Sequence, residues 1–192
     1  MTKIYMVRHG KAAAGWGADK DPGLDDEGRA QSEAVAATLQ RVTGAPLPVL
    51  SSPLRRCRET AEPLSGLWGL EPIIEPAVAE IPSPIDDLQA RGEWLRAAMA
   101  GTWADLAAAP SQGAAIDFSA WRQGVVDALR RQTQDAVVFS HFIAINAAAG
   151  HALDDDRMVV FRPDNCSVTV FEVSAERLTL VERGEEADTK VN

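Results

Sequence analysis

Short runs of β-branched and apolar residues alternate along this chain with longer segments in which apolar residues recur every three or four positions. Residues 3–8 (Lys-Ile-Tyr-Met-Val-Arg) form the first short run, which is typical of a buried strand. Asp25 stands where a helix N-cap belongs, and the apolar positions after it predict a helix over residues 26–42 that ends before Gly44. The pattern therefore opens with a strand, a loop and a helix.

The same order of strand and helix is repeated further along the chain. We expect strands at residues 48–52, 71–75, 136–140, 168–173 and 178–181, and helices from Leu54 to about Leu67 and from Phe142 to about Ala149. Pro53 favours the start of the earlier of these helices, because the first turn does not need its missing N–H. Alternating strands and helices predict an α/β fold, a three-layer α/β/α sandwich around a mostly parallel central sheet.

One stretch departs from this rhythm. Pro82 and Pro84 break regular structure. Residues 85–132 then have the pattern of helices, with interruptions near Gly101, Pro110 and Gly113. We interpret residues 1–192 as one domain with a variable, lid-like helical insertion at about 82–125, which lies over the carboxyl ends of the strands.

Composition narrows the class of protein. The 192 residues are 46% hydrophobic and 24% charged, which is the balance of a folded globular chain. The formal net charge of −9 at pH 7 argues against nucleic acid or an anionic membrane as a partner, because both are bound through excess Lys and Arg. Cys57 and Cys166 are too few for a disulfide framework, and we expect no signal peptide because Arg8 interrupts the first apolar stretch. We expect a cytoplasmic protein; the sequence carries no signal for an oligomeric state.

Residues suited to phosphoryl chemistry follow several of the predicted strands. The first strand ends in Arg8 and His9, Arg56 follows the second, and His141 follows the strand at 136–140. In open α/β sheets, ligands bind outside the carboxyl ends of the strands. Guanidinium groups repel a metal cation but bind phosphate oxygens through paired hydrogen bonds, and a neutral imidazole can attack phosphorus. This set predicts phosphoryl transfer without a metal or another cofactor.

Four passages, in this order, resemble the signatures of the histidine phosphatase superfamily, also called the phosphoglycerate mutase-like family. They are Val7-Arg8-His9-Gly10, Leu24 to Gln31, Ser51 to Ala61, and Val138-Phe139-Ser140-His141. The resemblance implies that His9 is the nucleophile that becomes phosphorylated. It implies that the phosphoryl group is clamped by Arg8, Arg56 and His141. The family's proton donor, a glutamate at the entrance to the insertion, matches Glu80.

The motifs together predict a metal-independent phosphomonoester hydrolase that acts on a small phosphorylated substrate through a phosphohistidine intermediate. Three departures favour a phosphatase over a mutase: Phe142 where many members have glycine, Pro82-Ser83-Pro84 in place of the mutase lid passage, and a loop over Lys11 to Trp16 with few hydrogen-bonding side chains. Two alternatives stay open: phosphoglycerate mutase-type phosphoryl transfer, and a non-catalytic phosphate- or phosphopeptide-binding module. The sequence does not identify the substrate.

Other side chains near these motifs are expected to be structural. Arg55 and Arg58 are predicted to lie on the surface or in ion pairs, and His151 at a helix end. Asn165 and Ser167 either help to position the site or form a turn. Five residues of the insertion either line a lid or build its core: Arg91, Trp94, Arg96, Trp103 and Trp121.

Overall fold

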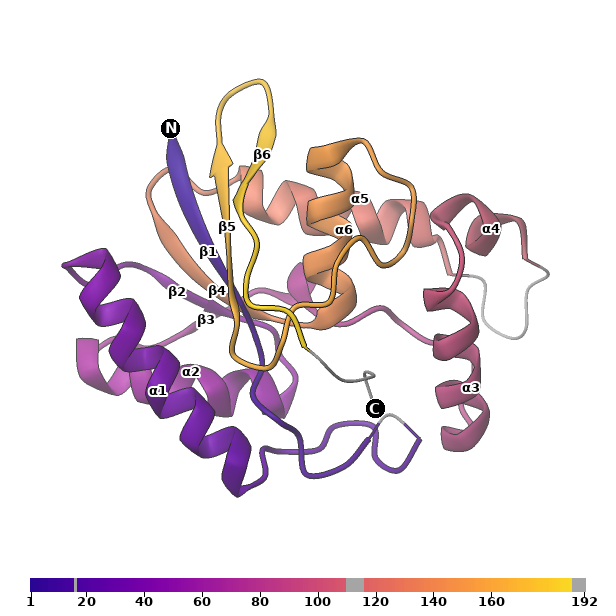
Figure 1. The fold of residues 1–192 in the computed structure, drawn as a ribbon, viewed down its shortest axis with the longest axis horizontal. Helices are drawn as coiled ribbons and strands as arrows, with labels where there is room; N and C mark the ends of the chain where they lie inside the picture. The colour runs from indigo at the N-terminus through magenta and orange to yellow at the C-terminus, as the bar shows by residue number, and fades with distance from the viewer. Residues whose placement is uncertain (16, 110–115, 188–192) are drawn as a thin grey trace.

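The computed structural model describes residues 1–15, 17–109 and 116–187 (Figure 1). In chain order its elements are β1 (Thr2–Arg8), α1 (Asp26–Thr43), β2 (Val49–Ser51), α2 (Arg55–Trp68), β3 (Ile73–Ile74), the 3-10 helix η1 (Pro76–Val78), α3 (Leu88–Met99), α4 (Trp103–Ala108), α5 (Phe118–Arg130), β4 (Ala136–Ser140), α6 (Phe142–Leu153), β5 (Val168–Val173) and β6 (Leu178–Glu182). The described strands form one sheet in the order β3-β2-β4-β1-β5-β6. The first four strands in that order run parallel to one another. β5 pairs antiparallel with β1, and β6 pairs antiparallel with β5.

The sheet is covered on both faces because its central strands are apolar on both sides. Along β1, Ile4 and Met6 pack into the hydrophobic cluster that includes α5 and α6. Tyr5 and Val7 point the other way and pack against α1 and α2. Successive side chains of a strand alternate between faces, so one short apolar strand builds two cores. Figure 1 shows the sheet between these two pairs of helices, and the predicted α/β/α sandwich is confirmed.

The ends of the elements show where local sequence rules hold. Asp25 caps α1 as predicted: its Oδ1 accepts the N–H of Gly28 at 2.7 Å. The expected start of α2 at Pro53 is wrong, because the helix begins at Arg55. The N–H of Arg55 donates a hydrogen bond to Oδ1 of Asp21 at 2.7 Å. Asp21 belongs to the loop after β1. A tertiary contact therefore caps this helix, which sequence rules do not foresee.

Two predictions in the middle of the chain are corrected or refined. The strand expected over residues 71–75 is shorter, Ile73–Ile74. Gly101 lies between α3 and α4, as expected, whereas the interruptions at Pro110 and Gly113 fall outside the described residues.

Aromatic side chains build the core beneath the predicted insertion. Trp103 stacks on Trp121 with ring centroids 5.8 Å apart, and Trp94 stacks on Phe118 at 5.9 Å. These rings belong to a third hydrophobic cluster that includes Phe142 of α6. The tryptophans are thus structural, and they tie α3 and α4 to α5 and α6.

Gly28 marks a close contact between α1 and the loop after β1. A β-carbon at Gly28 would lie 2.1 Å from the carbonyl oxygen of Lys11. We expect Gly28→Ala to lower the free energy of unfolding by about 1–3 kcal/mol, the usual effect of overpacking. Urea unfolding measures the change. In the control Gly66→Ala, the new β-carbon meets nothing within 4 Å, and this variant should be stabilised by about 0.5–1 kcal/mol. Equal free energies of unfolding for the two variants would contradict the close contact between Gly28 and Lys11.

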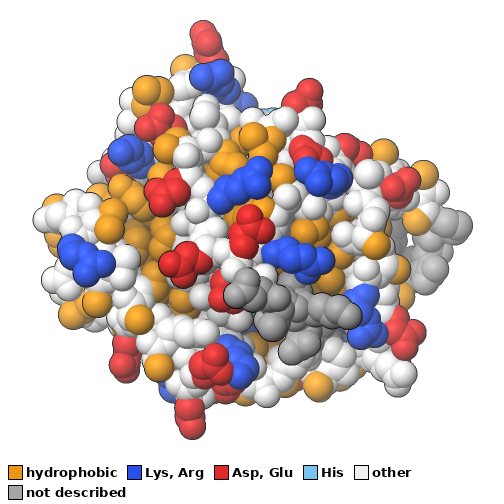
Figure 2. Space-filling model, in the orientation of Figure 1, with side chains coloured by type: hydrophobic (Ala, Val, Ile, Leu, Met, Phe, Trp, Pro, Cys, Tyr) orange, Lys and Arg blue, Asp and Glu red, His pale blue; other side chains and the backbone are white. Residues whose placement is uncertain are grey.

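The surface mixes charges of both signs. Figure 2 shows Lys and Arg side chains beside Asp and Glu side chains on the visible face, so the excess acidic residues do not form a single acidic patch there. Among the helices of the described residues, none is long and apolar enough to cross a membrane.

Candidate active site

His9 follows the last residue of β1, and neighbouring segments hold its backbone. Its N–H donates to the carbonyl of Ser140 at 3.0 Å, and its carbonyl accepts from Nδ2 of Asn165 at 2.8 Å. The N–H of the next residue, Gly10, donates to Oγ1 of Thr60 at 3.0 Å. The imidazole is therefore fixed at the carboxyl end of a central strand, and Asn165 helps to position it.

The two ring nitrogens of His9 have different partners, which assigns the tautomer. Nδ1 lies 2.8 Å from the carbonyl oxygen of Gly10, so Nδ1 carries the proton and donates it. Nε2 accepts a hydrogen bond from Nε of Arg56 at 3.1 Å. Burial lowers the pKa of His9 well below its ordinary value, and the charges of Arg56 and Arg8 lower it further. The result is a neutral imidazole with its lone pair on Nε2.

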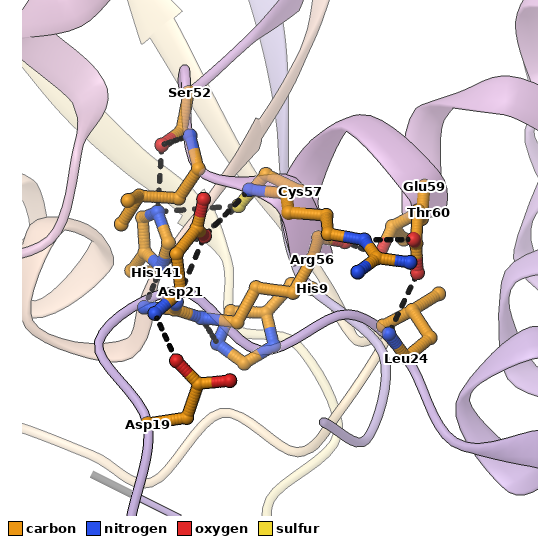
Figure 3. Close-up of polar contacts among 12 residues, drawn as sticks. His9, Asp19, Asp21, Leu24, Ser52, Arg56, Cys57, Glu59, Thr60 and His141 are labelled. Atoms are coloured by element: carbon orange, nitrogen blue, oxygen red, sulfur yellow. Dashed lines mark hydrogen bonds and ion pairs between the residues drawn. The ribbon is translucent and has the colours of Figure 1, made fainter. Parts of the chain in front are cut away.

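Arg56 connects the two histidines (Figure 3). While its Nε donates to His9, its Nη2 donates to Nδ1 of His141 at 3.1 Å. The other ring nitrogen of His141, Nε2, then donates to Oγ of Ser52 at 2.7 Å. His141 is 0% exposed, and burial with the charge of Arg56 holds its pKa well below the ordinary value. Both histidines are therefore neutral.

Two contacts hold the guanidinium of Arg8 at the end of β1. Its Nη1 donates to the carbonyl of Pro163 at 2.9 Å. Its guanidinium carbon lies 5.2 Å from the ring centroid of Phe142, which is a cation–π distance. Phe142, which stands where many family members have glycine, thus stabilises the guanidinium of Arg8 through its ring.

Glu80 lies just after η1 and is 7% exposed. Its Oε1 accepts the N–H of Ile81 at 3.0 Å. Burial raises the pKa of Glu80 above its ordinary value, and the nearby charges of Arg56 and Arg8 only partly oppose this effect. A buried carboxyl with a raised pKa keeps its proton at a pH where an exposed glutamate has lost it, which is the state that a general acid requires.

A cavity of about 590 Å³ opens at these residues. The loop after β1 forms one wall, and α3 contributes Arg91, Leu95 and Met99 to another. These three residues are spaced by four positions and so share one helix face. The two walls meet at the rim, where a β-carbon at Gly92 would lie 3.6 Å from Cα of Gly17. The expected helices over the carboxyl ends of the strands are therefore in place.

The structure brings the predicted site residues together with one difference. Among the described residues, four of them line the cavity: Arg8, His9, Arg56 and Glu80. His141 does not line it; its ring centroid lies 5.2 Å from that of His9, and Arg56 donates a hydrogen bond to each of the two rings.

Outside the cavity, the expected structural roles hold. Arg55 forms an ion pair with Glu59, with Nε and Oε1 2.6 Å apart, while Arg58 and His151 are exposed.

Three residues that contact the site, Ser52, Thr60 and Asp21, were not predicted from the sequence. Ser52 and Thr60 lie within the quoted passage Ser51 to Ala61, and Thr60 follows Arg56 by four positions on the same face of α2, so their spacing was an available signal. Asp21 gave no local signal: Nη1 of Arg56 lies 3.9 Å from Oδ1 of Asp21, a contact that depends on how a distant loop packs. Arg91, one of the five insertion residues for which a lid or a core role was open, lines the cavity.

Solved structures with the same fold support this architecture. A phosphoserine phosphatase from Entamoeba histolytica in complex with phosphoserine matches with a TM-score of 0.74 and 19% identity, over 95% of this chain and 96% of that one. A putative α-ribazole-5′-phosphate phosphatase from Escherichia coli matches with a TM-score of 0.72 and 18% identity, over 99% of both chains. A mycobacterial glucosyl-3-phosphoglycerate phosphatase matches with a TM-score of 0.71 and 22% identity, over 97% and 100%.

Family membership rests on the sequence itself. No curated protein matches the chain significantly. The sequence model of the family described as "Histidine phosphatase superfamily (branch 1)" matches residues 4–186. This range contains His9, Arg56, Glu80 and His141. The match confirms the resemblance seen in the four passages and the predicted enzyme class, a phosphatase of the histidine type. The chain belongs to the histidine phosphatase superfamily, branch 1.

Proposed function

We propose that this protein hydrolyses small phosphomonoesters through a phosphohistidine at Nε2 of His9, without a metal. The observation that carries the proposal is the opposite effect of burial on two groups in one cavity. The hydrogen bonds of His9 leave its lone pair on Nε2, and burial lowers the pKa of His9 while it raises the pKa of Glu80. Burial thus favours both the neutral imidazole that a nucleophile needs and the protonated carboxyl that a general acid needs.

The proposed reaction has two steps. Nε2 of His9 attacks phosphorus, the bond from phosphorus to the ester oxygen breaks, and the departing oxygen takes the proton of Glu80. Water then attacks the phosphohistidine, the Glu80 carboxylate takes a proton from that water, and the phosphorus–nitrogen bond breaks. Inorganic phosphate is released, and both side chains return to their starting states.

Arg56 is the group that must change partners when substrate binds. In this structure its Nε–H occupies the lone pair of His9. Phosphate oxygens are stronger acceptors for a guanidinium than a neutral imidazole. We infer that a bound phosphoryl group draws these N–H groups to itself and leaves Nε2 free to attack. Arg8 completes the clamp, and His141 supports Arg56 through Nδ1.

Removal of metal tests the proposal directly. The purified chain should release phosphate from p-nitrophenyl phosphate at the same rate with and without excess EDTA, because guanidinium groups stabilise the transferred charge. Mass spectrometry after an alkaline quench should find phosphate on His9. Loss of the rate in EDTA, restored by a divalent cation, would overturn the metal-independent mechanism.

Product analysis separates the alternatives. A phosphoglycerate mutase would isomerise phosphoglycerate without releasing phosphate. A binding module would bind phosphorylated ligands without forming a phosphoenzyme. The proteins with similar folds named above are all described as phosphatases, one of them putatively, which favours the hydrolase.

A further inference from the structure

Ser52 lies between β2 and α2 and is not among the described residues that line the cavity. It is 0% exposed. Its N–H donates to the carbonyl of Phe139 at 3.0 Å, which ties it to β4. Its Oγ lies 2.7 Å from Nε2 of His141, and Figure 3 shows the two side chains pointing toward each other. The hydroxyl of Ser52 is therefore a fixed partner of the second buried histidine.

The contacts of His141 leave one arrangement of its proton. A guanidinium has donors and no acceptor, so Nη2 of Arg56, 3.1 Å from Nδ1 of His141, must donate to that nitrogen. Nδ1 therefore keeps its lone pair, and the neutral ring carries its proton on Nε2. This N–H needs an acceptor, because a buried donor without a partner is costly. Oγ of Ser52 supplies that acceptor.

The thiol of Cys57 is a second group near Nε2 of His141, and it is a poor substitute for the hydroxyl. Its Sγ lies 3.2 Å from Nε2, but sulfur is a weak acceptor. The thiol itself donates to the carbonyl of Ser140, with Sγ and that oxygen 3.3 Å apart. Oγ of Ser52 also accepts the N–H of Leu54 at 3.2 Å, which helps to fix its direction. Among the described residues, Ser52 thus supplies the strong acceptor for His141.

Arg56 extends this contact to the proposed nucleophile. Its Nη2 meets His141, while its Nε donates to Nε2 of His9 at 3.1 Å. The guanidinium is planar and rigid, so the place of one of its nitrogens sets the direction of the others. If His141 carried its proton on Nδ1, two N–H groups would face each other and would push Arg56 out of this position. The tautomer of His141 therefore controls where the guanidinium of Arg56 points.

We propose that Ser52 is a positioning residue: its hydroxyl holds the proton of His141 on Nε2, and His141 in turn holds Arg56 in the orientation that receives the phosphoryl group. This inference rests on the proposed phosphatase function and adds a residue that acts on the same site without touching the substrate. Arg56 contacts the phosphoryl group both before and during transfer, so Ser52 should affect phosphate affinity as well as rate.

The tautomer of His141 tests the first step of this relay. The chain has three histidines, so a long-range proton–nitrogen NMR spectrum of protein with labelled histidine can be assigned with His9→Ala and His151→Ala. In the wild type, His141 should carry its proton on Nε2. In Ser52→Ala the sulfur of Cys57 is left as the neighbour of Nε2, and His141 should populate the tautomer protonated on Nδ1. A wild-type His141 protonated on Nδ1 would overturn the proposal.

Kinetics and phosphate binding test the second step. Ser52→Ala should raise KM for p-nitrophenyl phosphate and the inhibition constant of inorganic phosphate. It should lower kcat/KM by about tenfold to a hundredfold, the worth of one hydrogen bond to a charged group. Ser52→Cys fills nearly the same space with a weaker acceptor, so it should change these quantities in the same direction. A loss confined to kcat, with unchanged phosphate affinity, would contradict the relay through Arg56.

The matched control is Ser51→Ala, which removes the neighbouring buried hydroxyl. Ser51 is also 0% exposed, and its Oγ donates to the carbonyl of Ser52 at 2.9 Å rather than to a histidine. Each variant loses a buried hydroxyl, and urea unfolding should show similar losses of stability. Ser51→Ala should nevertheless keep the tautomer of His141, the phosphate affinity and the rate. Equal losses of phosphate affinity in the two variants, or a normal tautomer and affinity in Ser52→Ala, would reduce Ser52 to a packing residue.

Failure of the relay is distinguishable from failure of the proposed function. If the protein is not a phosphatase, the wild type releases no phosphate from p-nitrophenyl phosphate, but the tautomer of His141 still depends on Ser52 and inorganic phosphate still binds more weakly to Ser52→Ala. If only the relay is wrong, the wild type hydrolyses the ester and Ser52→Ala keeps the wild-type phosphate affinity.

Discussion

His9→Ala should lower phosphate release from every substrate by at least about 10⁴-fold, the size of loss seen when a covalent nucleophile or its partner is removed. The reason is that Nε2 of His9 forms the bond to phosphorus, and the other buried imidazole, His141, does not line the cavity. Steady-state kinetics with p-nitrophenyl phosphate measures the rate, and mass spectrometry should find no phosphoenzyme.

The matched control is His151→Ala. His151 is an exposed histidine in the last turn of α6, so its loss should not change the rate. Circular dichroism on both variants shows whether they are folded, which matters because His9 is buried. A folded His9→Ala protein that keeps its phosphatase activity would rule out His9 as the nucleophile.

Glu80→Gln should affect substrates according to their leaving group. Alkyl phosphates need a proton on the departing oxygen, so kcat/KM for them should fall by about 10²–10⁴-fold. With p-nitrophenyl phosphate the leaving group departs unprotonated, and formation of the phosphoenzyme should slow by less than about tenfold. Because the same carboxylate activates the hydrolytic water, p-nitrophenol should then appear as a rapid burst equal to the enzyme concentration, followed by slow turnover.

The pH dependence checks the protonation state of the same residue. Glu80 must be protonated to act as an acid, so kcat/KM for an alkyl phosphate falls as pH rises through its pKa. Burial raises that pKa above the ordinary glutamate value, which places the falling limb at a higher pH than for an exposed carboxyl. The limb should be absent from Glu80→Gln measured with the same substrate. Identical profiles for the two proteins, or no burst, would remove Glu80 from the reaction.

Local sequence patterns predicted most of the fold. The strands at 136–140 and 168–173 agree with the structure to the residue, because alternation and β-branched side chains describe a strand locally. Asp25 marked the start of α1 for the same kind of reason, since its cap bond spans three residues. The start of α2 was wrong because its cap comes from Asp21, far away in sequence, and no local rule contains that contact.

By itself, the sequence determined the order of strands and helices and the residues that collect at one edge of the sheet: Arg8, His9, Arg56 and His141. Strand ends depend on nearest neighbours, and parallel strands bring their carboxyl ends together. Only the tertiary structure decided that His141 contacts Arg56 without lining the cavity, that burial raises the pKa of Glu80, and that Arg91 lines the cavity. Burial and electrostatic coupling arise from segments that are distant along the chain, so they exist only once the chain is folded.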